Sequence, residues 1–150
     1  MSLKLKDAPD HHDAELVMKL YELRRESLMR EARNALSREF WPTKAEELLA
    51  FTKNDHPHNA AYRQVSSYWE MAYGMVTHGV LHGDFMLESN GEGFFVFARV
   101  KPFLAELRAA SSPRAWHNTE WVAHHSPFAK ELYARFEKGV QARLAARAKG

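Results

Sequence analysis

The segment SSYWEMAYGMVTHGVLHGDF, residues 66–85, carries the clearest structural signal in the chain. Apolar residues recur at three- and four-residue steps through it and just before it, as on one face of a helix. Gly79 then follows as a natural helix-ending residue, with Val80 and Leu81 folding back against the helix end. We therefore predict a central helix over residues 59–78, with an apolar face of Tyr62, Val65, Trp69, Ala72 and Val76, widened by Tyr68, Met71 and Met75.

The same periodicity continues on the N-terminal side of this helix. Leucine and alanine recur at helical spacing from about Asp10 onward, and Pro42 stops the pattern, which predicts one long helix or two shorter ones. Thr43 and Glu46 then fit a capping box at the start of a short helix. We expect residues 1–9 to form a short polar arm.

Residues 85–97 permit two interpretations. Asn90-Gly91 between apolar runs is typical of a hairpin turn, but the flanking residues do not alternate as strand residues do. A lone two-stranded hairpin is also only marginally stable. We therefore expect a helix here, with a hairpin as the alternative, and Pro102 kinking or restarting the helix that follows.

Two Ser-Pro pairs predict helix starts further on, at Ser112-Pro113 and Ser126-Pro127, with serine as the cap and proline in the first turn. No repeat or convincing sheet pattern is present. The sequence therefore predicts an all-α fold, in which residues 10–150 form a single compact, bundle-like domain of about six or seven helices.

The amino-acid composition excludes several classes of function. The chain has 150 residues, 45% of them apolar, and a net charge of +2, so it is typical of a globular protein and not of a dedicated nucleic-acid binder. It contains no cysteine, which excludes disulfides, thiolate metal sites and cysteine nucleophiles. No run of about 18 apolar residues predicts a transmembrane segment, and no signal peptide is recognisable. We therefore expect a cytoplasmic protein of bacterial type.

Four segments together resemble a bacterial family of short helical proteins of unknown function. They are LYELRRESLMREARNAL, the FWP turn, YRQVSSYWEMAYGMVTHGVL and FFVFARVKPFLAELR, and the resemblance covers about residues 13–108. The shared signatures are the Tyr-Glu-Leu-Arg run, the Trp69-Glu70 pair and the Pro-Phe-Leu…Leu-Arg segment. The resemblance implies an all-helical fold and no particular activity.

Nine histidines direct attention to metal sites. His117, Glu120 and His124 lie within about 60° of one another on a predicted helix, a face that zinc or iron could use if another element added a ligand. The alternative is a solvated or core-edge helix face. The H-E-x-x-H motif and the repeated Glu-x-x-His motif of di-iron bundles are both absent. We predict no cofactor.

Arg63 and Glu70 are the candidate ligand-binding pair, two turns apart on the less apolar side of the central helix. Glu70 beside Trp69 could act as a buried acid in a cavity, and Tyr73 completes the candidate set. The alternative is an ion pair between Glu70 and an arginine of another helix, such as Arg24 or Arg25. No phosphate loop, no hydrolase elbow and no catalytic residue is predicted.

These patterns leave three functional hypotheses. The first is a non-catalytic interaction or homo-oligomerisation module. The second is a small protein or enzyme that binds a ligand through the Glu/Arg cavity or a metal through the His/Glu helix face. The third is binding to an anionic membrane surface or nucleic acid through residues 135–149, where five basic residues accompany a single acid.

Overall fold

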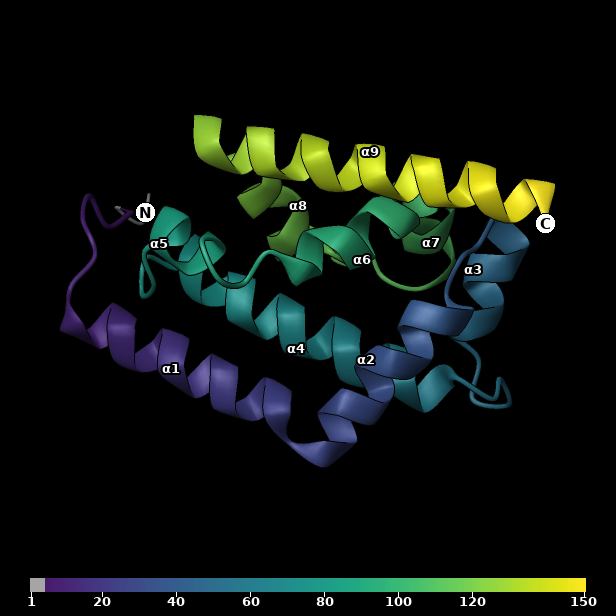
Figure 1. The fold of residues 1–150 in the computed structure, drawn as a ribbon, viewed down its shortest axis with the longest axis horizontal. Coiled ribbons are helices and arrows are strands. Elements are labelled where there is room, and N and C mark those ends of the chain that lie inside the picture. Colours follow the sequence, from purple (N-terminus) through teal and green to yellow (C-terminus); the bar gives the residue numbers. More distant parts are fainter. Residues whose placement is uncertain (1–4) are drawn as a thin grey trace.

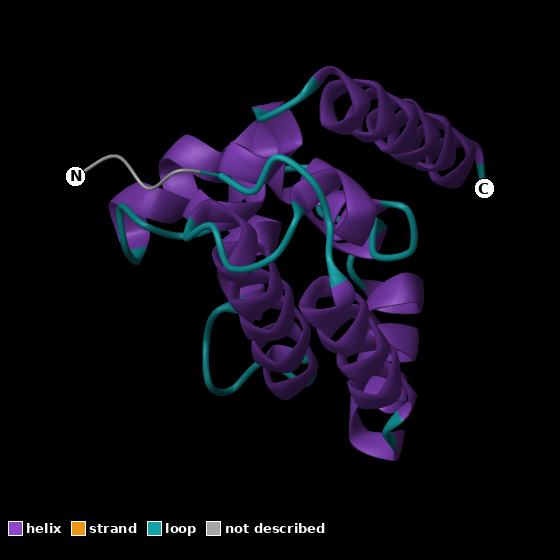
Figure 2. Ribbon diagram, turned by 90° about the vertical axis from the view of Figure 1, so that its left-hand side faces the viewer, coloured by secondary structure: helices purple, strands orange, loops and turns teal. Residues whose placement is uncertain are grey.

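The computed structural model describes residues 5–150, so residues 1–4 of the predicted polar arm lie outside the described part of the chain. Over the described residues the chain is helical and contains no strand, which confirms the all-α prediction (Figure 2). The elements are α1 (His11–Arg25), α2 (Ser27–Glu39), α3 (Ala45–Phe51), α4 (Asn59–Thr77), α5 (Gly83–Leu87), α6 (Glu92–Val100), the 3-10 helix η1 (Lys101–Phe103), α7 (Leu104–Ala110), α8 (His117–His124) and α9 (Pro127–Lys149).

The predicted central helix is α4, which packs against α2 on one side and α8 on another (Figure 1). α1 and α2 form one edge of the molecule, and α9 runs along the opposite edge, packed on α6 and α8. No helix within residues 5–150 is both long enough and apolar enough to cross a membrane.

The core is built around aromatic side chains of α4 and α6. Trp69 and Tyr73 are fully buried, as are Phe94 and Phe97, and the Tyr73 hydroxyl donates to the Asn90 carbonyl at 2.8 Å. Gly93 allows this close packing, because a Cβ at that position would overlap the Tyr73 ring. α4 has a broad apolar face because other helices cover it on several sides.

Several helix boundaries follow the predictions. Gly79 has a φ of 74°, and the Val80 N–H donates to the Met75 carbonyl at 2.8 Å, so α4 ends in a Schellman turn. Ser126 caps α9 by accepting from the Ala129 N–H, with Pro127 in the first turn. Residues 85–87 and 92–97 are helical, in α5 and α6, with a turn between them, and the hairpin alternative is wrong.

Other boundaries correct the predictions. The capping box of Thr43 and Glu46 does not form, because the Thr43 hydroxyl donates to Glu47 and Lys44 is the N-cap of α3. Ser112-Pro113 does not open a helix either. The residues after it form turns, and α8 begins only at His117, behind Trp116 in the left-handed region at φ 59°.

Candidate functional site

The four predicted ligand-binding residues do not share one site. Trp69 and Tyr73 have no exposed surface and belong to the core. Arg63 is exposed, and it lines a shallow depression together with the half-buried Glu70 and hydroxyl residues of α4 and the α7–α8 loop. The structure therefore brings together only Arg63 and Glu70, and ligand binding there stays a prediction.

Glu70 has a structural contact that the sequence did not reveal. Its carboxylate accepts hydrogen bonds from the Asn118 N–H at 3.1 Å, from the Thr119 N–H at 2.8 Å and from the Thr119 hydroxyl at 2.6 Å. The carboxylate thus caps the N-terminus of α8 from a different helix, where free N–H groups and the helix dipole favour a negative charge.

The predicted arginine partners of Glu70 lie elsewhere. Arg24 donates to the Ser89 carbonyl, and its guanidinium lies over the rings of Tyr21 and Trp69. Arg25 lies over the Tyr21 ring. The predicted ion pair is therefore wrong, and the cap on α8 takes its place.

The predicted metal ligands lie on α8. His117 and His124 are exposed, and Glu120 forms an ion pair with Arg108 at 3.1 Å. Nowhere in residues 5–150 do three His, Cys, Asp or Glu side chains group in a way that could hold a metal ion. A metal at these residues stays a prediction.

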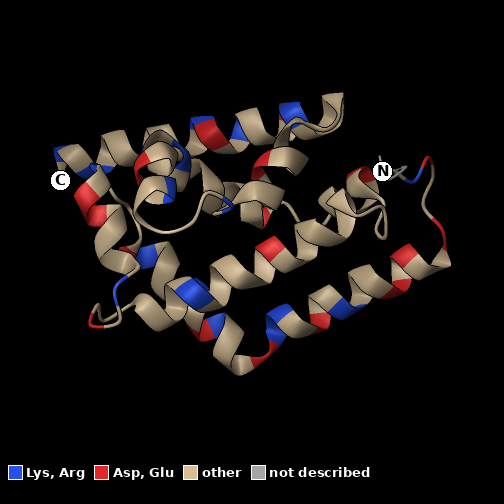
Figure 3. Ribbon diagram, turned by 180° about the vertical axis from the view of Figure 1, so that it is seen from behind, with Lys and Arg blue, Asp and Glu red and all other residues tan. Residues whose placement is uncertain are grey.

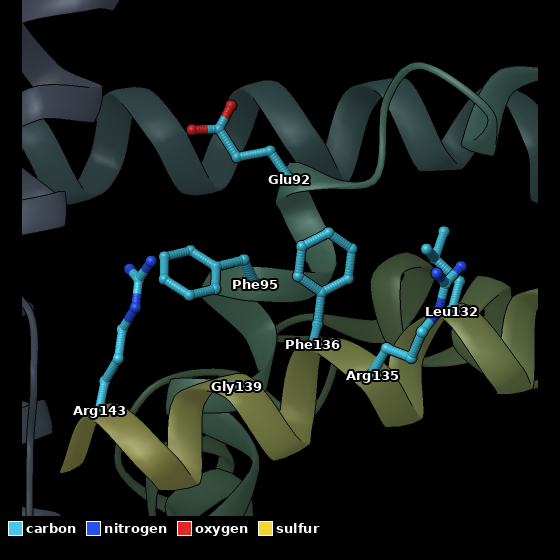
Figure 4. A pocket seen from close by; sticks show the side chains of 7 residues that line it. All are labelled: Glu92, Phe95, Leu132, Arg135, Phe136, Gly139 and Arg143. Atoms are coloured by element: carbon cyan, nitrogen blue, oxygen red, sulfur yellow. The ribbon is translucent and has the colours of Figure 1, made fainter. Parts of the chain in front are cut away.

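A groove between α6 and α9 was not predicted. It has a volume of about 510 Å³ and is shown in Figure 4. Its walls carry two aromatic rings and one leucine, with an arginine toward either end of the α9 wall. The lining residues are Glu92, Phe95, Leu132, Arg135, Phe136, Gly139 and Arg143.

The groove has an excess of positive charge. Its single carboxylate, Glu92, is held by Arg33, whose Nε donates to both carboxylate oxygens at 3.1 and 2.9 Å. The Arg143 guanidinium lies 5.0 Å from the centre of the Phe95 ring. Neither Arg135 nor Arg143 forms an ion pair within residues 5–150.

A further cation lies behind this groove. Arg99 is 2% exposed, and its guanidinium lies 4.5 Å from the centre of the Phe95 ring. It donates to the carbonyls of Leu36, Phe40 and Phe95, and no carboxylate of the described residues pairs with it. The pKa of Arg99 is lowered to about 9, chiefly because the guanidinium is buried; nearby Glu92 opposes this shift and Arg143 adds to it. Arg99 therefore stays charged at neutral pH.

A second unpredicted surface is the outer face of α1. Ala14, Met18, Tyr21 and Arg25 follow one another at steps of four, three and four residues, and all are exposed. Charged residues flank this row, and together they line a shallow hollow. We call these seven residues the α1 strip: Ala14, Glu15, Met18, Lys19, Tyr21, Glu22 and Arg25.

Sequence reasoning could have found this strip. Met18 is 66% exposed and Tyr21 is 47% exposed, and both fall off the apolar stripe that faces the core. The α1 helix already has one apolar face that packs on the core. A second row of apolar residues on the same helix therefore indicates an exposed contact surface.

A family model described as a domain of unknown function, DUF4760, matches residues 9–126. The chain belongs to the DUF4760 family. This confirms the resemblance to helical proteins of unknown function. No curated protein and no solved structure matches the chain.

The DUF4760 match includes α1 to α8 and ends at Ser126, immediately before α9. The α1 strip and the depression at Arg63 and Glu70 therefore lie within the DUF4760 region. The groove has one wall from the DUF4760 region, in α6, and the other from α9.

Proposed function

We propose that this DUF4760 protein is a non-catalytic interaction module of the bacterial cytoplasm, and that it pairs with a second copy of itself through the α1 strip. The observation that carries the proposal is the spacing of the strip. Steps of four and three residues place side chains in one row along a helix, as in the seam of a two-helix coiled coil.

The charged residues of the α1 strip are complementary to those of a second copy related by a two-fold axis. Figure 3 shows that α1 carries charges of both signs. If two α1 helices pair antiparallel about the level of Leu20, Lys19 lies opposite Glu22 of the partner subunit. Glu15 then lies close to Arg25 of the partner subunit. Because a two-fold interface presents the same surface twice, each of these pairs occurs twice.

The apolar part of the strip also fits such pairing. In the same arrangement Met18 lies against Tyr21 of the partner subunit, and both side chains are about half exposed or more in the single chain. Methionine, tyrosine and arginine are enriched in protein interfaces. The Tyr21 rings and Met18 thioethers of both subunits would be buried from water when the subunits pair.

A charge-exchange experiment tests the proposal by measuring mass against concentration in analytical ultracentrifugation. Lys19→Glu or Glu22→Lys alone places like charges across the interface, and each is expected to weaken the dimer about tenfold. The double variant Lys19→Glu/Glu22→Lys restores opposite charges, both within α1 and across the interface, and should recover the dimer.

Glu131→Arg provides the control, since this exposed residue lies on α9 at the other edge of the molecule. It should leave the dimer unchanged. A wild-type chain that is monomeric at all concentrations would overturn the proposal, as would a dimer that both single variants leave intact.

A further inference from the structure

We infer that the groove between α6 and α9 binds a small organic anion, with its apolar body against Phe95 and Phe136 and its acidic group on Arg143. The acidic group is a carboxylate, a sulfonate or a phosphate. This inference concerns a different surface from the α1 strip and does not depend on the chain forming a dimer.

The groove suits an apolar body of limited length. The rings of Phe95 and Phe136 come from opposite helices and lie next to each other, with centroids 6.2 Å apart, and Leu132 completes the apolar lining (Figure 4). Arg135 and Arg143 lie eight positions apart on α9, about 12 Å along the helix axis. The volume of about 510 Å³ is within the range of pockets for small ligands.

The charge of the groove calls for an anion. Arg33 already neutralises Glu92, which leaves Arg143 and Arg135 without a carboxylate among the described residues. Arg99 adds a buried positive charge on the Phe95 ring. A guanidinium that lies over an aromatic ring still has the N–H groups at the edge of its own plane, and these can donate to an acidic group.

Gly139 lies in the α9 wall of the groove. A Cβ built at this position meets no atom within 4 Å, so the space above it is free. Glycine in the middle of a 23-residue helix costs about 1 kcal/mol relative to alanine. A large side chain at this position would stabilise α9 and extend into the space of the groove.

The test uses two dyes that differ in one group: anilinonaphthalene sulfonate and phenylnaphthylamine, which lacks the sulfonate. Titration of the full chain, followed by dye fluorescence, should show at least tenfold tighter binding of the sulfonate. Arg143→Ala should weaken binding of the sulfonate about tenfold and leave binding of the neutral dye unchanged. Lys138→Ala removes an exposed cation of the same helix outside the groove and should change neither.

Substitution of Gly139 tests the location of the site. Gly139→Leu should abolish binding of the sulfonate dye and raise the melting temperature, whereas Gly139→Ala should raise the melting temperature and keep most of the binding. Three results would overturn the inference: equal binding of both dyes, unchanged binding in Arg143→Ala, or unchanged binding in Gly139→Leu. A wild-type chain that binds neither dye would also overturn it.

Discussion

Asp13 is a buried carboxylate that joins the start of α1 to the turn before α5. It has no exposed surface, and it accepts hydrogen bonds from the Asp10 N–H at 2.8 Å and the His82 N–H at 2.9 Å. Lys6 Nζ lies 2.9 Å from the same carboxylate. Burial by itself would raise the pKa of Asp13, but the hydrogen bonds from His82, Lys6 and Asp10 outweigh burial and hold the pKa below its ordinary value.

This shift predicts loss of stability in acid. Because the pKa is lower in the folded chain than in the unfolded chain, the ionised carboxylate stabilises the fold fully above the unfolded value. That stabilisation declines as the pH falls below about 4, through the folded pKa. Asp13→Asn should lower the free energy of unfolding by about 2 kcal/mol at pH 7. Urea unfolding across this pH range should show a weaker acid dependence in the variant than in the wild type, and an equal acid dependence would contradict the assignment.

At the same scale, the sequence identified Glu70 as an important residue but not its role. A glutamate beside Trp69, on the less apolar side of the central helix, indicates either a buried acid or a member of an ion pair. Its partners are N–H groups 48 and 49 residues further along the chain. Backbone groups leave no signature in the sequence, so an arginine partner was the nearest available prediction.

Helix ends show where local sequence is sufficient. The start of α9 at Ser126-Pro127 and the end of α4 before Gly79 were predicted correctly. Both depend only on residues next to each other in the sequence, a serine cap in one case and a left-handed glycine in the other. The start of α8 was predicted wrongly at Ser112-Pro113, because its cap comes from α4. A tertiary cap replaces the local one, and the helix begins at His117, four residues later than the serine-proline signal implies.

The tertiary cap on α8 gives a prediction at the level of the element. Glu70→Gln keeps the size of the side chain but replaces one acceptor oxygen with an amide that faces N–H donors. We expect a loss of about 2 kcal/mol in the free energy of unfolding. Amide exchange should accelerate most at Asn118 and Thr119. Glu131→Gln on the surface of α9 serves as the control, and uniform exchange changes along the chain would argue against a specific cap.

At the level of the whole molecule, periodicity predicted the helices but not their pairing. The groove needs α6 and α9 side by side, and the residues that line it are about 40 positions apart in the sequence. Arg135 and Arg143 belong to the basic segment 135–149, which the sequence suggests as a surface for an anionic membrane or nucleic acid, but nothing in that segment indicates a groove shared with α6. Only the packed arrangement shows that Arg33 neutralises Glu92 and that, within residues 5–150, no carboxylate pairs with Arg99.

α9 lies outside the DUF4760 match, yet it belongs to the same core as the other helices. Ala129, Tyr133 and Val140 are buried, and the Tyr133 ring packs against Phe94 and Phe97 with centroid distances of 5.8 Å. Removal of α9 would expose aromatic rings that have no contact with water in the full chain. The apolar surface uncovered in this way would cost several kcal/mol, a large part of the stability of a domain of this size.

We therefore predict that a fragment ending at Ser126 loses cooperative thermal unfolding and near-ultraviolet circular dichroism while keeping much of its helical signal. A chain ending at Leu144 is the matched control, because every residue after Leu144 is exposed, and it should unfold within a few degrees of the full chain. If the fragment ending at Ser126 unfolds as cooperatively as the full chain, the core closes without α9. Loss of cooperative unfolding in this fragment would show that the folding unit includes α9 and extends past residue 126, where the family match ends. The reason is that Phe94 and Phe97 need Tyr133 to exclude water.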